Sequence, residues 1–97
     1  MPFYVLIGHD RPDGLEKRKE QRPAHLEHMA KLDAAGCLRY GGPLLNEKGE
    51  MTGSLIILEA KTFEEASATY AQDPYVVHRV FEHYEVVHTK PIFPRGN

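Results

Sequence analysis

The sequence contains a single cysteine, no tryptophan and no long apolar run. With only Cys37 available, no internal disulfide can form, and such sparing use of cysteine fits a reducing compartment. No segment approaches the roughly 20 apolar residues that span a bilayer, and no charged segment precedes a long apolar stretch near the start. These absences predict a cytoplasmic protein with no membrane partner.

The chain also lacks an excess of basic charge. Its formal net charge is -2, whereas a nucleic-acid-binding domain usually carries basic residues along one face or one element. Nucleic acid is therefore not an expected partner. Hydrophobic residues make up 41% of the sequence and charged residues 27%, which is typical of a globular chain, and the length predicts one domain over residues 1–97.

Apolar runs and turn residues predict four strands and two main helices. The strands are expected at residues 3–7, 38–42, 54–59 and 81–89, and the helices at residues 15–35 and 62–71. Gly8 is expected to stop the first strand, Gly36 to end the first helix, and Pro23 to divide or kink that helix. Thr62 and Glu65 form a capping box before the second helix.

The element order predicts the fold class. A strand-helix-strand-strand-helix-strand order indicates an α+β, ferredoxin-like, four-stranded antiparallel sheet with both helices on one face. The other face would then stay bare. Where such a face is apolar, a second copy of a small domain usually covers it, so we expect a homodimer.

His25 lies among apolar residues of the first expected helix. At about 100° per residue, Met29 and Leu32 fall within about 40° of it, so its imidazole should face the sheet. Imidazole can give or take a proton near neutral pH because its unperturbed pKa is about 6.5. A lone histidine on an apolar face is more often a core residue satisfied by one hydrogen bond, so periodicity leaves both interpretations open.

Three other charged residues could act with His25. Arg18 and Arg22 fall on the same side of the helix and could attract an anionic or enolate-like group, although arginine stems also lie along apolar surface with their heads in water. Asp73 could orient His25, which would complete a minimal general acid–base pair. Asp73 also precedes a proline, however, where it would cap a short helical turn beginning near Tyr75.

Other candidate residues carry weaker signals. Ser54 could supply a hydroxyl, and Gly42-Pro43 could let a ligand approach the backbone, or all three could simply shape the strands. The five-residue interval between His83 and His88 matches no familiar zinc pattern, and strand alternation puts the two on opposite faces. No metal or other cofactor is therefore expected.

Several short motifs, taken in order and spacing, resemble the YCII-related family. They are His9-Asp10, Leu15-Glu16-Lys17-Arg18, Arg22-Pro23-Ala24-His25-Leu26, Gly42-Pro43, Gly53-Ser54, Asp73-Pro74-Tyr75-Val76 and Val80-Phe81-Glu82-His83. Each motif alone is weak, but together they cover nearly the whole chain.

The resemblance implies a fold of the dimeric α+β barrel type and a site centred on a histidine and an aspartate, which correspond to His25 and Asp73. It also implies an enzymatic family, in which one relative resembles a dehydrochlorinase of chlorinated hydroxyquinols. Around this pair, the candidate substrate-binding residues are Arg18, Arg22, Gly42, Pro43, Ser54 and Tyr75.

These observations favour a small cofactor-independent enzyme in which His25 transfers a proton and Asp73 orients or charges it. Proton abstraction, elimination, isomerisation or hydrolysis of a small, cyclic or aromatic, anionic compound would all use this pair. The alternative is a non-catalytic small-molecule binding or sensor protein on the same scaffold. Analogy at the level of the fold also allows a haem-degrading or quinol monooxygenase.

Overall fold

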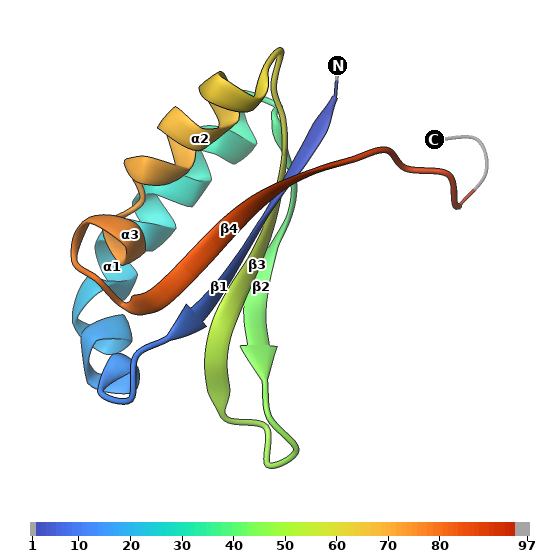
Figure 1. Cartoon of the computed structure of the whole chain (residues 1–97). Coiled ribbons are helices and arrows are strands. Elements are labelled where there is room, and N and C mark those ends of the chain that lie inside the picture. Colours follow the sequence, from blue (N-terminus) through green and yellow to red (C-terminus); the bar gives the residue numbers. More distant parts are fainter. Residues whose placement is uncertain (1, 95–97) are drawn as a thin grey trace.

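The computed structural model describes residues 2–94 and places the helices on one face of a four-stranded sheet (Figure 1). The elements are β1 (Phe3–Asp10), α1 (Gly14–Ala34), β2 (Leu38–Leu45), β3 (Met51–Glu59), α2 (Phe63–Ala71), α3 (Pro74–Val77) and β4 (Phe81–Thr89). The strand order is β2-β3-β1-β4, and the pairings are antiparallel. The predicted α+β, ferredoxin-like fold is confirmed.

Strand alternation sorts the side chains of the sheet onto two faces. On the covered face, which packs against the helices, β1 and β3 bury Tyr4, Leu6, Ile56 and Leu58. On the open face, the same two strands present four apolar side chains that are only half-buried: Val5, Ile7, Leu55 and Ile57. The core of the chain therefore lies on one side of the sheet.

The hydroxyl of Tyr70 anchors α2 to the covered face. It lies 2.7 Å from the carbonyl oxygen of Tyr4 and 3.0 Å from that of Ile56, so it can donate to either strand. Burial raises the pKa of Tyr70 above its ordinary value of 10.0. The phenol is therefore held in its neutral, donating form.

Three strands run further than the sequence predicts. β1 continues through Gly8 to Asp10, β2 continues through Gly42 to Leu45, and β3 begins at Met51 rather than at Ser54. The expected end of the strand at Gly8 is wrong because this glycine does not break the strand; it makes room for a side chain that packs on it. A Cβ atom built there would lie 2.9 Å from the ring of Phe81, so only glycine lets the ring close over β1.

The helix ends follow local signals, whereas the expected division of α1 is wrong. α1 passes through Pro23 as one helix; both Pro23 and Lys19, whose carbonyl loses its helical partner, are solvent-exposed. Gly36, with φ of +80°, follows the end of α1 as predicted, and the hydroxyl of Thr62 accepts the Glu65 N–H at 3.1 Å.

None of the described helices is long and apolar enough to cross a membrane.

Candidate active site

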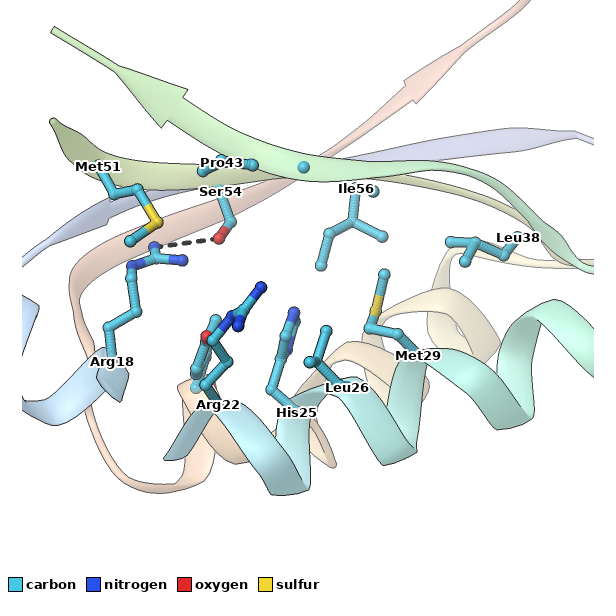
Figure 2. Close-up of a pocket in the computed structure, with 13 residues that line it drawn as sticks. Arg18, Arg22, His25, Leu26, Met29, Leu38, Pro43, Met51, Ser54 and Ile56 are labelled. Atoms are coloured by element: carbon cyan, nitrogen blue, oxygen red, sulfur yellow. Dashed lines mark hydrogen bonds between the residues drawn. The ribbon is translucent and has the colours of Figure 1, made fainter. Parts of the chain in front are cut away.

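A cavity of about 310 Å³ lies between α1 and the covered face of the sheet. Figure 2 shows side chains of α1 projecting towards β2 and β3 across this space. His25 and all six candidate substrate-binding residues line the cavity: Arg18, Arg22, Gly42, Pro43, Ser54 and Tyr75. Asp73 does not line it and lies behind His25 instead.

His25 and Asp73 meet although 48 residues separate them in the chain. Nδ1 of His25 lies 2.8 Å from Oδ1 of Asp73, and the two side chains are 12% and 1% exposed. Because a carboxylate can only accept here, Nδ1 carries a proton, and in the neutral imidazole Nε2 keeps a free lone pair. A histidine held by a carboxylate in this way can act as an oriented general base.

Asp73 also caps the short helix α3, so its two predicted roles are not exclusive. The same oxygen, Oδ1, accepts the backbone N–H of Tyr75 at 2.9 Å. The second oxygen, Oδ2, is buried and has no hydrogen-bond partner among residues 2–94. The cap therefore holds the carboxylate rigidly while it contacts His25.

Tyr75 forms the second support of the imidazole. Its ring stacks on that of His25 with centroids 3.8 Å apart and planes 6° apart, and the guanidinium carbon of Arg18 lies 4.7 Å from the Tyr75 centroid. Burial raises the pKa of Tyr75, and the nearby charge of Arg18 opposes that rise only in part. The phenol is therefore neutral near pH 7 and does not compete with His25 as a base.

The two arginines of the cavity differ in their surroundings. Arg18 is 3% exposed and donates from Nε and Nη2 to the two carboxylate oxygens of Asp10, at 3.0 and 2.9 Å, and from Nη2 to the Ser54 hydroxyl at 3.1 Å. Arg22 is exposed, and no carboxylate within residues 2–94 forms an ion pair with it. Of these two arginines, Arg22 is the one without an ion-pair partner in the described part of the chain.

Sequence reasoning missed Asp10 as part of this network. Asp10 belongs to one of the family motifs and ends β1, beside the start of α1. This position could have indicated that its carboxylate pairs with a basic side chain of α1, as it does with Arg18. Sequence reasoning also left out apolar residues on both sides of the cavity, among them Leu26 and Met29 on α1 and Met51 on β3. The helical wheel had placed Met29 on the His25 side, and this placement could have identified it.

The remaining histidines lie away from the cavity. The rings of His9 and His83 are 5.1 Å apart across β1 and β4 on the open face, whereas His88 stacks on Tyr4 with centroids 4.9 Å apart. The prediction that His83 and His88 lie on opposite faces is therefore confirmed. Within the described residues, no group of three or more His, Cys, Asp or Glu side chains could hold a metal ion.

The chain is similar in sequence to known proteins over most of its length. A family model for the YCII-related domain matches residues 2–90. The chain belongs to the YCII-related family. Protein YciI of Escherichia coli O6:H1 is 40% identical over 97 residues, covering 94% of this chain and 99% of YciI. The family thus extends over nearly all of the chain and includes the site.

Solved structures of other proteins have folds similar to that of this YCII-related chain. TftG, the 5-chloro-2-hydroxyhydroquinone dehydrochlorinase of Burkholderia phenoliruptrix AC1100, solved with 2,5-dihydroxybenzoquinone, has a TM-score of 0.80 at 29% identity, covering 91% of this chain and 93% of TftG. A Nitrosomonas europaea protein assigned as an antibiotic biosynthesis monooxygenase has a TM-score of 0.57 at 16% identity, covering 96% and 100%. The second similarity shows the fold alone.

Proposed function

We propose that this YCII-related protein is a small enzyme that moves a proton on a small cyclic compound, with His25 as acid–base residue and Asp73 as its orienting partner. The observation that carries the proposal is the 2.8 Å contact between His25 Nδ1 and Asp73 Oδ1 beside a cavity. A histidine held this way can present the lone pair of Nε2 to a bound molecule. A similar TftG structure, from a dehydrochlorinase, supports small-molecule chemistry at this site.

Elimination is the reaction that this pair suits best. His25 Nε2 takes a proton from the substrate, the electrons of the broken bond form a new double bond, and the leaving group departs as an anion. Because the substrate loses only H–X, the step balances without an oxidant or reductant. Isomerisation would use the same pair by returning the proton at another atom, and hydrolysis would use it to take a proton from water.

The size and lining of the cavity limit the substrate. A volume of about 310 Å³ is at the lower end of the range of about 300–1,000 Å³ for small-molecule sites. The wall opposite His25 is apolar, with Ile56 and Met51 on the sheet side. A single ring with oxygen substituents fits this combination of apolar wall and basic side chains.

The proposal is tested by turnover of chlorinated and hydroxylated quinols, starting with 5-chloro-2-hydroxyhydroquinone and measuring chloride release. His25→Ala should reduce kcat/KM by about 10²–10⁴-fold, the usual contribution of a general base. Asp73→Asn keeps an oxygen for the α3 cap, so it should reduce turnover while the protein stays folded. His28→Ala is the matched control, since His28 lies on α1 but does not line the cavity.

The outcomes separate an enzyme from a binding protein. Wild-type turnover that survives His25→Ala unchanged would refute the acid–base role. Tight binding of 2,5-dihydroxybenzoquinone without turnover of any compound tested would favour the non-catalytic sensor. Equal losses in His25→Ala and His28→Ala would point to a general effect on α1 rather than to chemistry.

We also propose that the protein is a homodimer and that the second copy covers the open face. The half-buried apolar side chains of β1 and β3 continue onto β4 at Val87 and onto β2 at Tyr40, both exposed. A contiguous apolar patch of this kind marks an interaction surface. Sedimentation at micromolar concentration should give a dimer, and a strict monomer would refute this assignment.

A cytoplasmic location remains a proposal that rests on Cys37. This half-buried residue is the one cysteine of the chain. Its thiol lies 3.4 Å from the carbonyl oxygen of Leu32 and packs against the core. A structural thiol of this kind suits a reducing compartment.

A further inference from the structure

We infer that the site takes an anionic substrate, that Arg22 binds its negative oxygen, and that Arg18 is a positioning residue although it lines the same cavity. The inference rests on the proposed function and names the substrate class: a small ring with an enolate, phenolate or carboxylate oxygen. It also separates two arginines that the sequence treats alike.

The charge of Arg18 is already matched. Its guanidinium makes a bidentate ion pair with Asp10, whose side chain is also almost fully buried, and adds a bond to Ser54. A substrate anion at Arg18 would have to share or displace the Asp10 carboxylate. Because an unpaired buried carboxylate is strongly unfavourable, Arg18 is better suited to hold β1, β3 and Tyr75 in place.

The charge of Arg22 is not matched. Arg22 lines the cavity, and the charged or titratable side chains that line it with Arg22 are Arg18, His25 and Tyr75. No carboxylate of the described chain lines the cavity, because Asp10 pairs with Arg18 and Asp73 lies behind His25. One unmatched cation therefore faces the bound molecule.

The position of Arg22 on α1 also fits the proposed chemistry. Arg22 precedes His25 by three residues, a spacing that brings side chains together on one face of a helix, and Figure 2 shows both directed towards the cavity. When His25 Nε2 removes a proton from the carbon beside a substrate carbonyl group, the electron pair first rests on the carbonyl oxygen as an enolate. The C=O bond then re-forms as the new double bond forms and the leaving group departs as an anion. A cation beside the base stabilises the charge that develops on the enolate oxygen.

The test is a binding titration that needs no turnover. The probes are 4-hydroxybenzoate and 4-hydroxybenzamide, which have the same shape but differ by one negative charge at pH 7, and binding is followed by NMR. Wild type should prefer the benzoate. Arg22→Gln should weaken benzoate binding by about 10–100-fold, since a charge-assisted hydrogen bond is lost, and should change amide binding by less than about twofold.

Three further variants sharpen the assignment. Arg22→Lys keeps the charge and should restore most of the preference for the anion. Arg18→Lys breaks the bidentate pair, so it should lower thermal stability and weaken both probes to the same extent. Lys19→Gln removes an exposed cation of α1 that does not line the cavity, and it should leave both affinities unchanged.

The results that would overturn the inference are distinct from those that test catalysis. It fails if wild type shows no preference for the benzoate, if Arg22→Gln weakens both probes equally, or if Arg18→Lys alone removes the preference. None of these results bears on the proton transfer by His25. Conversely, loss of that role would leave the anion preference of Arg22 in place.

Discussion

The covered and open faces of the sheet come from the same strands but differ in what packs on them. On the covered face, apolar side chains form the core, and the network around His25 lies between α1 and the sheet. On the open face, apolar side chains of β1 and β3 remain half-buried, and none of the described helices lies over them (Figure 1). The covered face thus contains the proposed site, and the open face carries the apolar surface that we propose a second copy covers.

The largest contrast is expected between two neighbouring residues of β3, Leu58 and Ile57. Leu58 is 1% exposed on the covered face, so Leu58→Ala should cost about 2–5 kcal/mol in free energy of unfolding through lost burial and a new cavity. Ile57→Ala removes a half-buried side chain from the open face and should cost clearly less in dilute protein. Urea denaturation of both variants beside wild type measures the difference.

The stability losses of Ile57→Ala and Leu58→Ala should also differ in how they depend on protein concentration. If a second copy covers the open face, the effect of Ile57→Ala should grow with concentration, because the dimer stabilises the folded state by mass action. The loss from Leu58→Ala should not depend on concentration in this way. Equal losses for the two variants at every concentration would contradict the division between the faces.

A smaller contrast is expected between two glycines. A Cβ atom on Gly8 would meet the buried ring of Phe81 at 2.9 Å, so Gly8→Ala should destabilise by about 1–3 kcal/mol. A Cβ atom on Gly42 would meet the hydroxyl end of the Tyr40 ring, 2.9 Å from its oxygen, and Tyr40 is 51% exposed, so this side chain can turn away. Gly42→Ala should therefore stay within about 0.5 kcal/mol of wild type in denaturant midpoint experiments.

The smallest effect on stability is expected at Tyr70, which anchors α2, and it should depend on pH. Tyr70→Phe should cost about 0.5–1.5 kcal/mol at pH 7 through the lost hydrogen bond. Because burial raises the pKa of folded Tyr70 above 10.0, the unfolded chain loses this proton first. The ionisation of Tyr70 should not affect stability at lower pH, and stability should fall as pH rises above about 10.

Denaturation between pH 7 and pH 11 checks this sign. Tyr70→Phe should flatten part of the alkaline decline, whereas Tyr84→Phe, at an exposed tyrosine of β4, should not. Tyr75, whose pKa burial also raises, should account for part of the remaining decline. An alkaline decline of the same size in Tyr70→Phe and wild type would show that this phenol does not titrate differently on unfolding.

Much of the fold is readable from local chemistry. The span of β4 was predicted at residues 81–89, and the caps at Thr62 and Asp73 occur where side chains accept N–H groups two or three residues ahead. Gly8 is not the strand end that local preference predicts, because the Phe81 ring that occupies the place of a Cβ atom comes from β4, far along the chain. Local preference cannot report such a contact.

The candidate site divides in the same way. Helical and strand periodicity determines which side chains share a face, and so puts Arg18, Arg22 and His25 on one side of α1 without any knowledge of partners. Tertiary packing decides which of these side chains has a charged partner. It brings Asp73 to His25 across 48 residues and Asp10 to Arg18, and leaves Arg22 unmatched. The partner of each side chain, and whether its charge is paired, depend on contacts between segments that are distant in the sequence. These contacts exist only once the sheet has brought the segments together.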